Sequence, residues 1–154
     1  MIDALVILAG VSAGLAATAA MTLIEIYFWK RWGIAGVFEW HENQVLAYRF
    51  FRLDPNRLHF AGIFFLHFAN GGLGGLALLI SIAFIPQLLS IPILILGVLY
   101  GLFLWTLTLA PIHKPITGLH PWKHPLGKGP ALASIGGHAV YGLVLGIILL
   151  IAVH

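Results

Sequence analysis

Four long apolar stretches, at about residues 5–29, 60–85, 91–110 and 131–153, most constrain what this chain can fold into. A transmembrane helix needs about 20 predominantly apolar residues, and each stretch is long enough. Hydrophobic residues make up 60% of the 154 residues and charged residues only 8%, so the chain has too little polar surface for a water-soluble globule. The sequence therefore predicts an all-α integral membrane protein, a bundle of four transmembrane helices forming one domain over residues 1–154.

The basic residues predict how the helices cross the membrane. Every Lys and Arg falls in one of two intervals between apolar stretches, residues 30–57 and 114–128. Because Lys and Arg in short loops resist translocation, both intervals are expected in the cytoplasm, with both termini outside, in a multi-pass protein of the cell membrane. This orientation accounts for the formal net charge of +3. We therefore expect the lipid bilayer and membrane proteins as partners, and no nucleic acid. The chain has no Cys, which excludes disulfides and thiolate catalysis.

Small residues recur at helical spacing in all four apolar stretches. Residues spaced by three or four share one face of a helix, and small side chains on that face let two helix backbones approach closely in lipid. We therefore interpret these faces as packing faces of a compact bundle. They contain Gly10, Gly14, Thr18 and Thr22 in the first stretch, Gly71, Gly74 and Gly75 in the second, Gly97 and Gly101 in the third, and Gly142 and Gly146 in the fourth.

Three ionisable residues, Glu25, His67 and His138, lie inside the apolar stretches at similar expected depths. Such residues are costly in lipid and are functional candidates by default, although each can also simply hydrogen-bond within the protein. One hypothesis is a transition-metal site made by these three residues with His59 or His113. Another is a b-type haem with His67 and His138 as its cofactor-binding axial ligands. A third is a role in proton transfer or in binding a lipid headgroup.

The first basic interval contains a predicted short helix. Residues 43–53 mix apolar and aromatic side chains with Arg49 and Arg52, a pattern typical of an interfacial helix under the lipid headgroups. Asp54 and Pro55 suit the start of the next helix. Just before this segment, Glu39, His41 and Glu42 lie close together in the sequence. Because neighbouring residues on a helix seldom share a face, we expect them to form a solvated polar turn rather than a metal site.

The second polar interval, residues 111–130, contains five Pro and three Gly, so we do not expect a regular helix there. Its segment from His120 to His124 resembles the His-x-x-x-His box of membrane di-iron desaturases and hydroxylases. Those enzymes bring several such boxes together on helices, whereas this box stands alone and contains Pro121. We therefore expect a basic loop that lies on anionic headgroups or contacts a partner subunit.

Two segments carry a family resemblance: the Gly-rich first stretch with Met21-Thr22, and residues 138–146 of the last stretch. They resemble small uncharacterised prokaryotic four-helix membrane proteins, which implies the same fold and no particular activity. From its size and small-residue faces we expect an accessory or scaffolding subunit of a larger membrane complex or homo-oligomer. The alternatives are a metal- or haem-binding redox protein and a proton or small-solute conductor. The sequence assigns no catalytic residue.

Overall fold

The computed structural model describes residues 4–153 of the chain, with side chains up to residue 151, and these residues form helices and connecting turns without a strand. Four helical segments are long and apolar enough to cross a membrane. They are α1 (Ala4–Trp32), α3 (Phe60–Phe84), the continuous segment Ile93–Thr117, and α6 (Gly129–Val153). The predicted fold class is therefore confirmed. Many large apolar side chains on the outside of these helices are exposed, as expected for contact with lipid.

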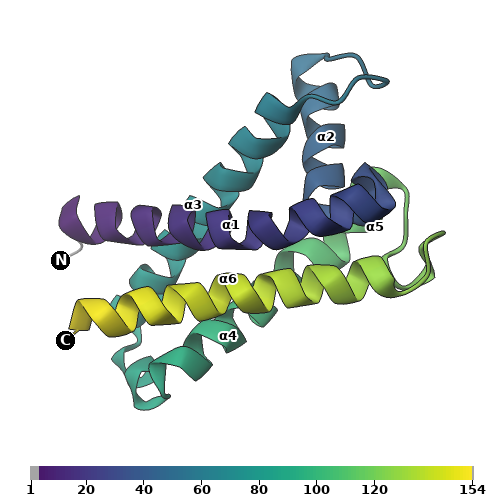
Figure 1. Cartoon of the computed structure of the whole chain (residues 1–154). Coiled ribbons are helices and arrows are strands. Elements are labelled where there is room, and N and C mark those ends of the chain that lie inside the picture. The colour runs from purple at the N-terminus through teal and green to yellow at the C-terminus, as the bar shows by residue number, and fades with distance from the viewer. Residues whose placement is uncertain (1–3, 154) are drawn as a thin grey trace.

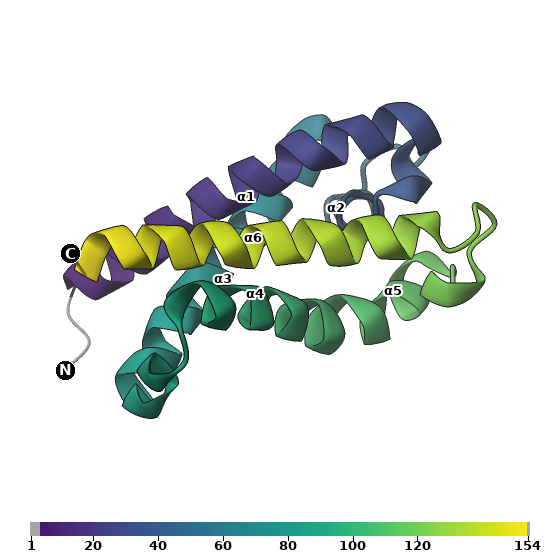
Figure 2. The ribbon, with the colours of Figure 1, turned by 60° about the horizontal axis from the view of Figure 1, so that its bottom comes forward.

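The four long segments pack in the order α3, α1, α6 and then α4 (Ile93–Leu104), so α1 and α6 form the centre of the bundle (Figures 1 and 2). The helix α3 crosses α1 at an angle and diverges from α4 towards the connecting loops (Figure 1). The first helix begins and the last ends at the same end of the molecule (Figure 1). We call the opposite end, formed by residues 33–59 and 118–128, the loop end.

Glycines allow the closest helix contacts. A Cβ atom on Gly14 would collide with the backbone of Gly71, and a Cβ atom on Gly97 would collide with the carbonyl group of Gly142. These contacts join α1 to α3 and α4 to α6. The predicted role of the small residues in helix packing is confirmed, and the packing is within the chain.

The helix α2 (Phe38–Phe51) differs from the predicted interfacial helix in length and surroundings. It begins five residues before the predicted start at residue 43, after the short 3₁₀ turn η1 (Ile34–Gly36). Its axis lies at a steep angle to that of α1 (Figure 1). Its first half is buried against α3, α5 (Ala110–Thr117) and α6, with Phe38 and Trp40 almost wholly inaccessible. The helix therefore enters the bundle between α3 and α6 and closes the loop end.

The polar connection between α2 and α3 forms a turn rather than the start of a helix. Asp54 accepts a hydrogen bond from the backbone N–H of Asn56 at 2.9 Å, and α3 begins only at Phe60. The prediction that Asp54 and Pro55 start the helix is thus wrong. Pro55 instead lies inside a local turn that Asp54 stabilises with its side chain.

The third span continues as a helix beyond the predicted end at residue 110. Between α4 and α5 lies one π-helical turn, η3 (Trp105–Leu109), and Pro111 follows it in the first turn of α5. A proline is tolerated in a first helical turn because its missing N–H has no obligatory partner there. The expectation that residues 111–130 hold no regular helix is therefore wrong up to Thr117. Residues 118–128 consist of turns with one 3₁₀ segment, η4 (Pro121–Lys123), and α6 begins at Gly129. The connection between α3 and α4 contains the 3₁₀ segment η2 (Pro86–Ser90).

The two basic intervals meet at the loop end. The guanidinium group of Arg49 on α2 donates a hydrogen bond to the carbonyl oxygen of Ile116 on α5 at 2.9 Å. The helices α2 and α5 also pack against each other. Both intervals thus belong to one end of the molecule, as a shared membrane side requires.

Candidate ligand-binding site

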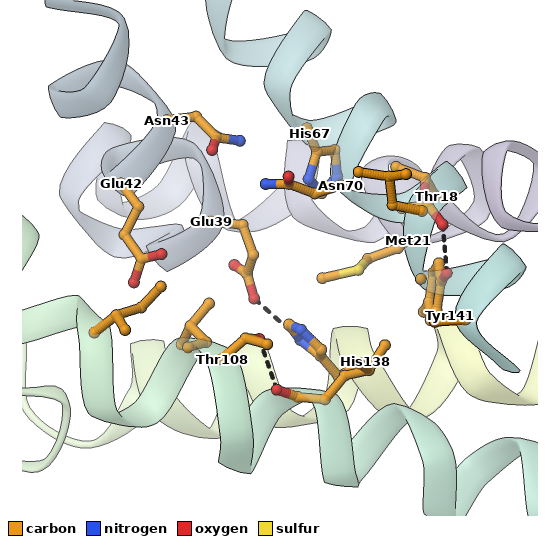
Figure 3. A pocket seen from close by; sticks show the side chains of 17 residues that line it. Thr18, Met21, Glu39, Glu42, Asn43, His67, Asn70, Thr108, His138 and Tyr141 are labelled. Carbon is orange, nitrogen blue, oxygen red and sulfur yellow. Dashed lines mark hydrogen bonds and ion pairs between the residues drawn. The ribbon is translucent and has the colours of Figure 1, made fainter. Parts of the chain in front are cut away.

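A cavity of about 460 Å³ lies between α3 on one side and α4, η3 and α5 on the other (Figure 3). Its polar end is formed by α2, α3 and α6, and its other walls are largely apolar. The polar end contains Glu39, Glu42, Asn43, His67, Asn70 and His138, and the apolar walls include Met21, Leu73, Ala77, Leu104, Leu109 and Ile112. Ligand sites in proteins combine these features, an apolar cleft with a few converging polar groups.

The mouth of the cavity faces sideways out of the bundle. On α3, Leu73 lines the cavity and is 62% exposed, while on α5 Ile112 lines it and is 41% exposed. Both residues belong to segments that are long and apolar enough to cross a membrane. The opening between them would therefore face lipid rather than water.

Two tyrosines join the helices beside the cavity, and one of them, Tyr141, lines it. The Tyr141 hydroxyl on α6 donates to the carbonyl of Gly71 at 2.6 Å, and the Tyr100 hydroxyl on α4 donates to the carbonyl of Gly74 at 2.6 Å. A Cβ atom on Gly74 would approach the Tyr141 hydroxyl to 2.8 Å, so the absence of a side chain at Gly74 leaves room for this hydroxyl. The tyrosines thereby tie α3 to α6 and α4 at the point where the helices diverge.

Glu39 and His138 form the ion pair at the centre of the polar end. Glu39 Oε1 lies 3.2 Å from His138 Nδ1 (Figure 3). The same oxygen accepts a hydrogen bond from the hydroxyl of Ser134, which itself accepts one from the indole N–H of Trp105. Burial raises the pKa of Glu39, but the contacts with His138 and Ser134 outweigh burial and lower it to about 2. The Glu39 carboxylate is therefore ionised at neutral pH. Its other oxygen, Oε2, is buried and has no hydrogen-bond partner among the described residues.

A second pair joins α1 to α3. Glu25 Oε2 lies 2.9 Å from His67 Nε2 and accepts a hydrogen bond from the indole N–H of Trp40 at 2.9 Å. Both ionisable side chains are buried. Because Trp40 comes from α2, this carboxylate joins three helices, which fixes the first half of α2 inside the bundle.

A third pair lies between the cavity and the loop end. Glu42 Oε1 on α2 is 2.9 Å from His113 Nδ1 on α5, and the His113 ring is fully buried and stacked on Phe38 at 4.1 Å between centroids. Burial raises the pKa of Glu42 to about 9, and the neighbouring charge of Glu39 adds to the increase. Glu42 therefore carries a proton at neutral pH and can donate a hydrogen bond to His113.

The structure distributes the predicted metal and haem ligands over separate contacts. Glu25 and His67 are paired, but His138 and His113 each contact a different glutamate, and the ring of His59 lies 3.1 Å from the backbone carbonyl of Asp54. Within the part of the chain that the structure describes, no group of three or more His, Asp or Glu is arranged to hold a metal ion. Axial ligation of a haem by His67 Nε2 would require loss of its contact with Glu25. Metal and haem binding stay predictions without a geometric basis here.

The expectation of a solvated polar turn at residues 39–42 is wrong, because Glu39 and Glu42 are 8% and 6% exposed. They point to the same cavity because they are three residues apart on a helix that turns back into the bundle. The sequence contained one signal for this: with Asn43 they form a polar face at spacings of three and four, next to the aromatic residues Phe38 and Trp40.

Comparison with known proteins adds no assignment. No protein-family model matches the sequence, and no curated protein or solved structure is significantly similar to the chain.

Proposed function

We propose that the protein binds a hydroxyl-bearing amphiphile of the bilayer in the cavity between α3 and α4–α5. The observation that carries this proposal concerns Glu39, a residue that lines the cavity: its buried Oε2 atom has no hydrogen-bond partner among the described residues. Buried polar atoms in folded proteins are almost always hydrogen-bonded. Because a carboxylate oxygen can only accept, the occupant that satisfies it must be a donor.

The charges at the polar end favour a neutral donor over a cation. Glu39 is already neutralised by its ion pair with His138, and Glu42 is protonated at neutral pH because its pKa is about 9. An ammonium group would therefore bring a charge that no group lining the cavity is left to balance, and burying an unbalanced charge is costly. A hydroxyl group needs only the hydrogen bond that Glu39 Oε2 offers.

The apolar walls and the sideways mouth fit the rest of an amphiphile. Leu73 and Ala77 line the α3 side, and Leu104 and Ile112 line the opposite side. The mouth opens within the predicted hydrocarbon layer, so a lipid tail can enter from the bilayer without passing through water. The volume of about 460 Å³ lies within the range of small-molecule sites, roughly 300–1,000 Å³.

Native mass spectrometry of the protein released from detergent micelles tests this function. The probes are dioleoylglycerol and its methyl ether, which lacks only the donor. We expect one dioleoylglycerol per protein and at least tenfold weaker binding of the ether, because a hydrogen bond to a charged group contributes about 1.5–3 kcal/mol. Equal binding of the two probes would overturn the proposal.

A pair of tryptophan variants controls for the location. Leu73→Trp narrows the mouth, while Leu99→Trp places the same side chain on an exposed part of α4 outside the cavity. We expect the first to lose dioleoylglycerol binding and the second to keep it. Equal behaviour of the two variants would place the lipid elsewhere on the surface.

A second candidate function is an accessory or scaffolding subunit of a larger membrane complex or homo-oligomer. Most glycine faces are used within the chain, but a Cβ atom on Gly136 of α6 would meet no other atom within 4 Å. Leu132 and Leu143, one helical turn and two turns away, are exposed as well. A partner helix can approach closely there. A monomeric mass in mild detergent, unchanged by Gly136→Leu, would remove this candidate.

A further inference from the structure

A chain of titratable side chains connects the cavity with the surface at the loop end. Glu42 lines the cavity and contacts His113 at 2.9 Å, and the ring of His113 lies 5.9 Å between centroids from the ring of His41. Along this chain the exposure increases: His113 is fully buried, whereas His41 is only partly buried. Glu42 thus connects His113 to the cavity.

Two ring nitrogens of this chain, His41 Nδ1 and His113 Nε2, are buried and lack hydrogen-bond partners among the described residues. The ring of His124 is held by its Nδ1 atom, which accepts a hydrogen bond from the backbone N–H of Leu126 at 3.2 Å. An unsatisfied buried polar group costs about 1–3 kcal/mol, so two of them on neighbouring rings are an expensive arrangement for packing alone. Imidazole is the side chain that exchanges protons most readily near neutral pH.

We propose that Glu42, His113 and His41 form a proton path between the loop end and the cavity, with His124 beside it. Glu42 gives its proton to His113 Nδ1 as His113 releases its Nε2 proton towards the His41 ring, and His41 passes a proton to solvent. The same steps in reverse return a proton from solvent to a Glu42 that has given its own to the cavity. Each ring releases one proton as it receives another, so the rings hold no extra charge. The path serves whatever occupies the cavity and does not depend on the identity of that occupant.

The surroundings of the path favour neutral groups that relay a proton. Burial, together with the smaller effect of the neighbouring rings of His113 and His124, lowers the pKa of His41 to about 4, so His41 is neutral at pH 7. The charged groups near Glu42 are Glu39 and His138, which neutralise each other as an ion pair. Glu42 therefore holds a proton at neutral pH that it can exchange.

The path ends in the cavity and does not continue through the molecule. Beyond the cavity, the described residues 4–24, 76–112 and 139–153 contain no Asp, Glu, His, Lys or Arg. The core there is apolar, with Leu78, Leu145 and Ala13 buried together. This arrangement supports proton exchange with a bound molecule rather than conduction across the membrane.

Infrared spectroscopy of the protein in lipid nanodiscs, where lipid covers the cavity mouth, tests the path. After transfer to D₂O, the C=O band of protonated Glu42, assigned by its loss in Glu42→Gln, shifts as the proton exchanges. We expect at least tenfold slower exchange in His41→Phe and in His113→Gln, which retains hydrogen-bonding capacity at the buried position. The control His59→Phe, a loop-end histidine outside the path, is expected to leave the rate unchanged.

Two outcomes would overturn the proposal. In the first, Glu42 exchanges equally fast in wild type, His41→Phe and His113→Gln, which means that protons reach it through the cavity mouth. In the second, His59→Phe slows exchange as much as His41→Phe. A cooperative thermal unfolding transition in the same nanodiscs shows that a variant is folded. Because His41 is partly exposed, His41→Phe keeps the test decisive if the variant at the fully buried His113 does not fold.

Discussion

Glu39 on α2 and His138 on α6 face each other with 3.2 Å between Oε1 and Nδ1. This contact brings the polar connection after the first span into the bundle beside the last span. It also creates the polar end of the cavity, because the second oxygen of the same carboxylate is left without a partner among the described residues. The fold of α2, the cavity and the proposed ligand therefore depend on one carboxylate.

The ion pair of Glu39 predicts that the protein loses stability at low pH. The folded-state pKa of about 2 lies below the ordinary value of 4.5, so the stabilisation is present above pH 4.5 and is lost as the pH falls towards 2. We expect Glu39→Gln to be less stable than wild type at pH 6 by about 1–3 kcal/mol and equally stable near pH 2. Thermal unfolding in detergent across this range measures the difference. A difference that is constant with pH would contradict the assignment.

The raised pKa of Glu42 predicts the opposite pH dependence, a loss of stability at high pH. Its folded-state pKa of about 9 lies above the ordinary 4.5, so the stabilisation it provides is complete below pH 4.5 and is lost as the pH rises through 9. Glu42→Gln removes the ionisation and keeps a polar group beside His113. We expect this variant to match wild type at pH 4.5 and to exceed it by at least about 1.4 kcal/mol at pH 9, the equivalent of one pKa unit. A variant that is less stable than wild type at pH 9 would show that Glu42 is ionised in the folded protein.

The glycine contacts predict a sharp contrast between two equal substitutions. Gly14→Ala places a Cβ atom against the backbone of Gly71, and we expect it to destabilise the protein by about 1–3 kcal/mol because the two helices must separate. Gly136→Ala adds the same atom where no neighbour lies within 4 Å, and we expect no loss, or a gain of about 0.5–1 kcal/mol from helix propensity. Unfolding in mild detergent compares the two. Equal losses would mean that α1 and α3 do not pack as described.

The positions of the basic intervals predict which residues can be labelled from each side of the membrane. The chain has no Cys, so Arg49→Cys, Lys123→Cys and Ser90→Cys each introduce a single reactive site. We expect a membrane-impermeant maleimide added to intact cells to label only Ser90→Cys, which lies on η2 between α3 and α4. Permeabilised cells should show labelling of all three. Labelling of Arg49→Cys but not Lys123→Cys in intact cells would contradict the shared side of the two intervals.

The spans and their packing faces were predictable because they depend on local properties. Length and apolarity define the spans, and glycines at helical spacing, such as Gly97 and Gly101, define the contact faces. The pairing of Glu25 with His67 was partly predictable from the sequence, because both residues were expected at similar depth inside the bundle.

The polar end of the cavity was not predictable in the same way, because it depends on how α2 folds back into the bundle. The polar residues of α2 are compatible with a solvated surface as well as with burial, and only the distant partners His138 and His113 distinguish the two cases. The helical course of Pro111 likewise depends on the π-helical turn before it, which moves the proline to a position where no N–H is required.

The most direct test of the central claim maps where a hydroxyl lipid contacts the chain. A dioleoylglycerol with a photoreactive group in one tail is cross-linked to the protein in nanodiscs, and the modified residues are identified by mass spectrometry. We predict adducts concentrated on the cavity walls, at Leu73, Ala77 and Ile112, and lost with an excess of unmodified dioleoylglycerol. Adducts spread equally over outward-facing residues such as Leu99 and Phe103, and insensitive to the competitor, would contradict the account.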